Sequence, residues 1–306
     1  MNTQRVYDFM GKRKLAALVS ITLVIASIVS LSSKGLVLGL DFTGGTLIEV
    51  GYERVVGVEA VRARLTEHDF VNPTVVHFGS EFDLLIKLQG EPEADLGEQV
   101  LTALRASGEN VELRRIEFVG PQIGEELRDD GGLGLLAALA VVMFYVAVRF
   151  QYKFSIAAVV ALIHDVLITL GFFSLFDIEF DLTVLAAVLA VIGYSLNDTI
   201  IVSDRIRENF RLLRTADPLA VINESLTQTL DRTLVTSLTT LLVLFALFLF
   251  GGELIHNFAT ALIIGITIGT YSSIYIAASL LLDLKIRREN LLPPERDGDK
   301  VDDGLP

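Results

Sequence analysis

The chain has 306 residues, 52% of them hydrophobic, and its mean hydropathy is +0.55. Values this high are unusual for a soluble globular protein and favour one embedded in lipid, and they exclude global disorder. The net charge of -13 and the isoelectric point of about 4.8 exclude a nucleic-acid partner held by bulk positive charge. The sequence contains no cysteine, which excludes disulfides and thiolate chemistry.

Six apolar stretches are long enough, or nearly so, to cross the roughly 30 Å of a bilayer core as helices. They are residues 15–31, 133–148, 154–176, 182–203, 226–250 and 254–282. The first follows Lys12, Arg13 and Lys14, as in a secretory signal. Its length and the lack of an A-x-A cleavage site favour an uncleaved span.

Positive charge in the short connections predicts how these spans are oriented, because Arg and Lys resist translocation. Arg or Lys occurs between spans two and three, between spans four and five, and after span six; the turns after spans three and five contain none. We therefore expect a multi-pass protein of the cytoplasmic (inner) membrane, with both termini cytoplasmic and the large loop 34–131 extracytoplasmic.

The large loop has short alternating apolar runs in place of continuous ones, and within residues 34–130 it carries 19 acidic and 9 basic residues. Strands are predicted at 46–52, 74–79, 82–88 and 111–118, and amphipathic helices at 58–68 and 96–106. This βαββαβ order is typical of a ferredoxin-like unit.

The predicted fold class is thus a membrane all-α bundle of six transmembrane helices with an inserted α+β ferredoxin-like extracytoplasmic domain. The expected divisions are the cytoplasmic N-terminus with the first span at 1–33, the outer domain at 34–131, the five-helix region at 132–284, and a cytoplasmic tail at 285–306. The tail is acidic and is predicted to be disordered.

Ionisable side chains inside the spans are functional candidates, because they cost several kcal/mol in a bilayer core. His164 and Asp165 lie about 15 to 17 Å into span three at 1.5 Å per residue, near the midplane. Asn197 and Asp198 lie in the inner third of span four, and Arg232 lies at a similar depth in span five. A carboxylate facing a guanidinium suggests a proton relay that opens when the acid is protonated. There are two simpler alternatives. Asp198 and Arg232 form a static ion pair, or their side chains extend to the membrane interface.

Glycines mark candidate packing and hinge positions. Gly193 lies one turn before Asn197, and Gly265 with Gly269 forms a GxxxG pattern in span six that favours close helix packing. Gly44 and Gly45 begin the outer domain, and the pair at 131–132 ends it, so both places are candidate flexible points or ordinary turns.

Four segments give a resemblance across nearly the whole chain: GLDFTGG (39–45), IGYSLNDTIIVSDRIRENF (192–210), RTLVTSLTTLL (232–242) and GTYSSIYIA (269–277). They are similar to the SecF branch of the SecD/SecF family of bacterial protein-export subunits, which resemble resistance-nodulation-division transporters. The resemblance implies a SecD partner, association with the SecYEG channel, often with YajC and YidC, and contact with a translocating polypeptide. It also implies that the proton-motive force drives export, with Asp198 and Arg232 at the family's proton-path positions.

The predicted role is therefore a non-enzymatic transport subunit, with no catalytic residue, metal or cofactor expected. Three alternatives remain: half of a proton-coupled exporter of small molecules or lipids, a passive scaffold, and an intramembrane aspartyl protease. In the protease, Asp165 and Asp198 would share a proton, although Asp198 lies in SLNDT and not in a GxGD pattern.

Overall fold

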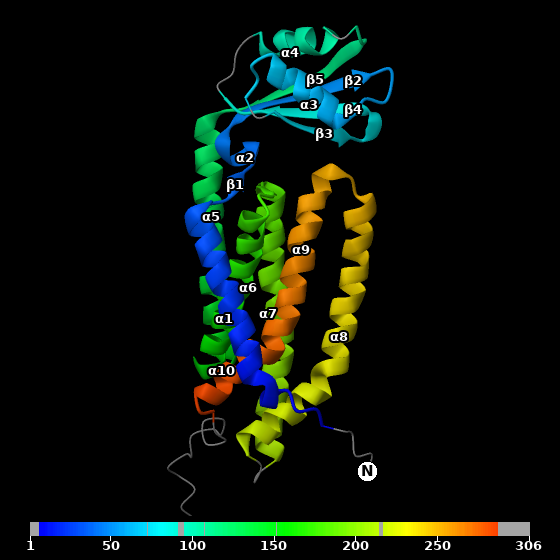
Figure 1. Ribbon diagram of the computed structural model, residues 1–306. Helices are drawn as coiled ribbons and strands as arrows, with labels where there is room; N and C mark the ends of the chain where they lie inside the picture. The colour runs from blue at the N-terminus through cyan, green and yellow to red at the C-terminus, as the bar shows by residue number, and fades with distance from the viewer. Residues whose placement is uncertain are drawn as a thin grey trace, which may run out of the picture.

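The computed structural model describes residues 6–286, except 72, 91–94, 107, 151 and 214–216. Long helices form a bundle, and a small sheet domain lies at one end of it (Figure 1). The start of α1 and the short helix α10 both lie at the end of the bundle away from the sheet. The predicted tail falls outside the described residues from position 287 onward.

Six helical segments in the described part of the chain are long and apolar enough to cross a membrane, which confirms the six predicted spans. The first five are formed by α1 (Arg13–Ser33), α5 (Pro121–Arg149), α6 (Tyr152–Leu175), α7 (Leu182–Leu212) and α8 (Pro218–Phe250). The sixth combines α9 (Glu253–Ser272), one π-helical turn (Ser273–Ala277) and α10 (Ala278–Asp283).

Several helices extend beyond the apolar stretches that predicted them. The helix α5 begins at Pro121, directly after strand β5, because proline at the first helical position lacks an N–H that would be unpaired there anyway. Gly131 and Gly132 therefore lie inside a continuous helix, and the connection to the outer domain is at Gly120. This differs from the predicted flexible end of that domain at 131–132.

The membrane helices have two apolar cores. The inner core, near the chain ends, joins residues of α6, α7, α8 and α10, including Phe154, Ile206, Ile222 and Leu281. The outer core joins α6, α7 and α9 through residues that include Phe173, Val188 and Ile266. The helices α6, α7 and α9 are the most enclosed, whereas α5 and α8 are largely exposed along their lengths. In Figure 1, α8 stands at one edge of the bundle and α1 and α5 at the other.

The outer domain contains β2 (Gly45–Tyr52), α3 (Val58–Glu67), β3 (Thr74–Phe78), β4 (Ser80–Leu88), α4 (Leu96–Arg105) and β5 (Val111–Val119). Its four strands pair antiparallel in the order β3-β4-β2-β5. Alternate residues of the strands, such as Ile48 and Ile86, form one core with Val61 of α3 and Val100 of α4. Both helices therefore cover the same face of the sheet.

A buried tyrosine lies at the edge of this core. Tyr52 is 6% exposed, and its hydroxyl has no hydrogen-bond partner in the described chain. Burial raises the pKa of Tyr52 to about 12, and the charge of Glu109 acts in the same direction. Glu109 itself forms an ion pair with Arg64, with Nη1 and Oε2 2.5 Å apart.

Short elements connect the sheet domain to the helices. After α1, strand β1 (Val37–Leu38) pairs in parallel with β6 (Glu179–Phe180), which lies between α6 and α7. The four-residue helix α2 (Leu40–Thr43) then leads into β2. The outer end of α7 is thus attached to the segment that enters the outer domain.

Candidate functional site

Asp165 of α6 is the centre of a buried hydrogen-bond network. Its side chain is fully enclosed, at 0% exposure. Oδ1 lies 2.9 Å from Nδ1 of His164, and Oδ2 accepts hydrogen bonds from Ser195 Oγ of α7 at 2.6 Å and Ser272 Oγ of α9 at 2.8 Å. One carboxylate therefore holds three helices together, and its oxygens are satisfied as a buried charge requires.

His164 extends this network toward α1. Its ring stacks on Tyr271 with centroids 6.4 Å apart, and the Tyr271 hydroxyl donates to the carbonyl of Ala16 at 2.7 Å. The same hydroxyl lies 3.1 Å from Ser20 Oγ. Nε2 of His164 is buried and has no hydrogen-bond partner among the described residues.

Gly265 and Gly269 lie where α9 packs tightly against α7. A Cβ added to Gly265 would lie 2.2 Å from Val191 Cγ2, and one added to Gly269 would lie 2.9 Å from Ser195 Cβ. The absence of side chains at these positions brings Ser272 within reach of Asp165. The structure thus places the predicted GxxxG pair directly beside the Asp165 network.

Asp198 of α7 has the opposite surroundings. It is 1% exposed, and neither carboxylate oxygen has a hydrogen-bond partner in the described chain. Ser237 of α8 lies beside it but makes no well-aligned hydrogen bond to it, because the Ser237 hydroxyl pairs with Thr270 at 2.7 Å. The nearby hydroxyls of Thr199 and Thr233 are also buried and unpartnered. Buried polar groups are normally paired, so this cluster between α7 and α8 is a candidate functional site.

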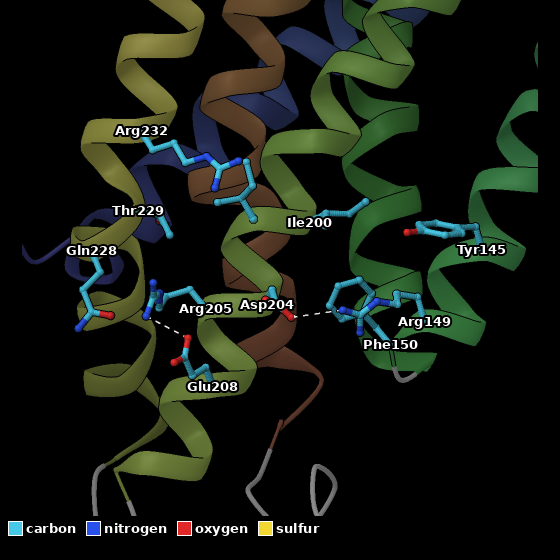
Figure 2. A pocket seen from close by; sticks show the side chains of 11 residues that line it. Tyr145, Arg149, Phe150, Ile200, Asp204, Arg205, Glu208, Gln228, Thr229 and Arg232 are labelled. Atoms are coloured by element: carbon cyan, nitrogen blue, oxygen red, sulfur yellow. Dashed lines mark ion pairs between the residues drawn. The ribbon is translucent and has the colours of Figure 1, made fainter.

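Arg232 faces Asp198 from α8, but the two do not form an ion pair. No carboxylate oxygen of the described residues lies within 4.0 Å of its guanidinium. Figure 2 shows its side chain extending from α8 toward α7. Arg232 lines a polar cavity of about 320 Å³ near the inner end of the bundle.

The rim of this cavity carries further charges. Arg149 of α5 lies 3.9 Å from Asp204, and Arg205 lies 3.0 Å from Glu208, as the dashed lines in Figure 2 mark. These charges surround the approach to Arg232 from the end of the bundle where the described chain begins and ends. The site is therefore polar on that side and apolar toward the outer core.

Asn197 and Gly193 lie on a different face of α7 from Asp198. Both are exposed, whereas Asp198 is buried, because adjacent residues are about 100° apart around an α-helix. A Cβ on Gly193 would meet no atom within 4 Å. Tyr194 instead points toward α8, where its hydroxyl donates to Thr240 at 3.3 Å. The structure therefore separates Asn197 from the candidate relay with which it was grouped.

Gly44 and Gly45 form the joint between the outer domain and the helices. Their φ angles are +72° and +146°, which side-chain-bearing residues rarely adopt. A Cβ on Gly44 would lie 2.9 Å from the backbone of Pro121, and one on Gly45 would lie 2.4 Å from the carbonyl oxygen of Leu88. The two glycines thus permit the start of β2 to pack directly against β4 and the start of α5.

Sequence reasoning located the ionisable residues but missed most of their partners. Ser195 was not singled out, although it lies three residues before Asp198 and therefore one turn away on the same helix. Tyr271 was also missed. In the described residues, no group of three or more histidine, aspartate or glutamate side chains is suited to bind a metal ion.

Comparison with known proteins gives consistent matches along the chain. Residues 99–287 match the family described as "Protein export membrane protein SecD/SecF, C-terminal", and residues 29–54 match "SecD/SecF GG Motif". The protein translocase subunit SecF of Vibrio alginolyticus is 50% identical, covering 99% of this chain and 98% of that protein. The same subunit of Pseudomonas aeruginosa is 49% identical, covering 97% of each.

Solved structures agree with these matches. The crystal structure of SecDF from Thermus thermophilus superposes with a TM-score of 0.81 at 38% identity, covering 93% of this chain and 39% of that one. A second SecDF structure, in a super-membrane-facing form, gives a TM-score of 0.73 at 39% identity, covering 94% of this chain and 40% of that one. This chain therefore spans less than half of the SecDF chains to which it is similar.

Proposed function

The chain belongs to the SecD/SecF family of protein-export membrane proteins, and from this premise we propose that it is the SecF-type auxiliary subunit of a protein translocase. With SecD, it uses the proton-motive force to promote polypeptide export across the cytoplasmic membrane. It acts as a non-enzymatic subunit, without a cofactor.

The observation that carries the proposal is the unpartnered carboxylate of Asp198. An ion buried without a partner costs several kcal/mol, so a carboxyl group in this position is suited to alternate between charged and neutral forms. Arg232 and the unpaired hydroxyl of Thr233 lie on the facing helix. Binding and release of a proton at Asp198 changes its attraction to Arg232 and thereby biases how α7 packs on α8.

Asp165 and His164 have a supporting part in the same relay. The Asp165 carboxylate is held by donors on α6, α7 and α9. It fixes the position of α7 relative to α9. The two helices therefore move together when the charge of Asp198 changes. The unpartnered Nε2 of His164 offers a further place for a proton beside this brace.

The exposed face of α7 is the surface that we assign to SecD. Ala186, Ala190, Gly193 and Asn197 follow one another at intervals of three or four residues, and all are exposed. Small residues at this spacing allow a second helix to approach closely, and the amide of Asn197 supplies an interhelical hydrogen bond. SecD occupying this face would lie across α7 from the candidate relay.

The outer domain is extracytoplasmic in this proposal and has the ferredoxin-like arrangement. The strand order β3-β4-β2-β5, with two helices on one face, supports the latter assignment. Both termini lie in the cytoplasm, the outer domain faces the emerging polypeptide, and the complex associates with SecYEG, with YajC and YidC as further members.

The test replaces the two candidate residues separately. Asp198→Asn and Arg232→Met should abolish the gradient-dependent stimulation of export in vesicles, while the protein still inserts and binds SecD. Asp283→Asn is the matched control, since Asp283 is an exposed carboxylate at the end of the sixth span and does not line the Arg232 cavity, and it should leave stimulation unchanged. Full stimulation in either test variant at normal expression would remove that residue from the mechanism.

A second experiment distinguishes export from small-molecule or lipid efflux. Cells that lack the protein should accumulate unprocessed precursors of exported proteins if its role is export.

A further inference from the structure

The outer end of α7 is joined to the outer domain by an ion pair as well as by the chain itself. Lys87 lies on β4, in the middle of the sheet, and Glu179 lies on β6, three residues before α7 begins. Nζ of Lys87 is 2.9 Å from Oε1 of Glu179, and the side chains are only 16% and 21% exposed. This pair is more enclosed than most ion pairs of the described chain, so solvent screens it less.

Glu179 is itself fixed from several sides. Its carbonyl oxygen accepts a hydrogen bond from Asn257 Nδ2 of α9 at 3.1 Å. A Cβ added to Gly39 would lie 2.9 Å from Oε1 of Glu179, so the glycine leaves the space that the carboxylate occupies. Movement of α7 or α9 therefore carries the carboxylate with it.

The first turn of α7 is held by Asp41 of α2 and by Asp181, the residue that precedes the helix. Asp41 Oδ2 accepts a hydrogen bond from the backbone N–H of Leu182 at 3.1 Å, and Asp181 caps the helix by accepting from Val184 at 2.9 Å. The unpaired N–H groups of a helix start are thus satisfied partly from α2, which leads directly into β2. The helix that carries Asp198 is continuous from this anchored end to Leu212.

From these contacts we infer that Lys87 and Glu179 are coupling residues, which transmit movement of α7 to the sheet of the outer domain. The inference rests on the proposed function, because it supplies the step between proton binding and outer-domain movement. The pair borders a cavity of about 260 Å³ that is also lined by Leu40, Thr74 and Gln89. Loss of the pair would therefore remove this direct contact between the sheet and the outer end of α7 and leave the connection through α2.

Other charged groups lie near the ion pair of Lys87 and Glu179. Lys34 and Asp177, which form a more exposed ion pair at 2.7 Å, lie beside it, as do the carboxylates of Asp41 and Asp181. Both aspartates are engaged by backbone N–H groups of α7. Among these groups, Lys87 is the cation that lies on the sheet, and through Glu179 it connects the sheet to the start of α7.

The test is a charge exchange in the full chain with its SecD partner. Lys87→Glu and Glu179→Lys should each lower gradient-dependent export about tenfold, while insertion, SecD binding and proton movement through the complex persist. The double variant, with the charges exchanged, should recover most of the wild-type rate. Arg64→Glu is the matched control, because it breaks a comparably enclosed pair within the outer domain, and it should leave export unchanged.

Each outcome decides the inference. Unchanged export in both single variants, or a folded double variant that does not recover, would overturn it. If a single variant fails to insert, Lys87→Met and Glu179→Gln take its place with the same expectations. If wild-type export does not respond to the gradient, the proposed function fails; if it responds and the variants respond equally, only the coupling role fails.

Discussion

Two buried aspartates on adjacent helices differ in how their charge is compensated. Asp165 has donors for both oxygens, whereas Asp198 has none in the described chain. A carboxylate that accepts hydrogen bonds from residues on several helices suits a fixed brace. A carboxyl group without donors suits a changing charge, which is the basis for assigning proton exchange to Asp198. No hydrogen bond joins the two, as the shared proton of an aspartyl protease would require.

Tyr52 gives a prediction at the scale of a single residue. With the pKa near 12 in the folded chain and about 10 when unfolded, only the unfolded form releases its proton between these values. The associated stability is fully present below pH 10 and is lost as the pH rises to 12, by about 2 kcal/mol. Tyr52→Phe should remove this alkaline loss and leave stability at neutral pH equal or higher, because the hydroxyl is unpaired.

Thermal unfolding of the full-length protein across this pH range measures the effect, and the tyrosinate absorbance difference between the two proteins reports the ionisation of Tyr52 directly. A difference spectrum that titrates at the ordinary tyrosine value would contradict the prediction. So would equal alkaline destabilisation of both proteins.

The sequence identified His164, Asp165, Asp198 and Arg232 because ionisable residues within apolar stretches are conspicuous. It did not identify their hydrogen-bond partners, since serine is common in membrane helices and its role depends on which helix it faces. Ser195 and Ser272 acquire their role only when α6, α7 and α9 meet. Asn197 is next to Asp198 in sequence but lies on a different, exposed face of α7, so its place in the relay stays a prediction.

At the scale of elements, the contact between α7 and α9 depends on glycine. Gly265→Ala should lower stability by about 1 to 3 kcal/mol, because its Cβ would lie 2.2 Å from Val191. Gly134→Ala on α5 is the control, since a Cβ there meets no atom within 4 Å. It should be neutral or slightly stabilising. Thermal unfolding in detergent measures both, and similar melting temperatures for the two variants would refute the packing role of Gly265.

Element boundaries were predicted less well than element types. Apolar stretches gave the membrane-crossing parts of the helices, but α5 and α8 begin 12 and 8 residues earlier than predicted, at Pro121 and Pro218. The added residues of α5 are mostly polar, charged or glycine, and those of α8 mix apolar residues with Asn223, Glu224 and Ser225, so neither segment continues the apolar run. The strands of the outer domain were predicted more closely, as alternation ends where a turn begins.

At the scale of the whole molecule, the proposed orientation can be tested because the chain contains no cysteine. Val71→Cys in the outer domain and Leu212→Cys at the end of α7 introduce single thiols at residues that are 75% and 67% exposed. A membrane-impermeant maleimide added to intact spheroplasts should label the first and not the second. Both should react after the membrane is permeabilised. Labelling of Leu212→Cys from outside would reverse the orientation.

The overall plan of six spans and an inserted sheet domain was predictable, because hydropathy and alternation act over long segments. The joints were not, because they depend on residues far apart in sequence. Lys87 and Glu179 are 92 positions apart, and neither lies in a recognisable motif for pairing. The parallel ladder of β1 and β6 involves only two residues on each side, too few for a sequence pattern.

The wide π-helical turn at Ser273–Ala277 has a consequence for the sixth span as a whole. Such a turn accommodates one more residue than an α-helical turn, which offsets the following side chains by about 100°. The half before it directs Ala261 and Ile266 into the outer core, and the half after it directs Ala278 and Leu281 into the inner core. If the extra residue moved along the span, by exchange of one backbone hydrogen bond at a time, only the residues that it passed would turn by about 100°, and the two ends of the span would keep their orientation.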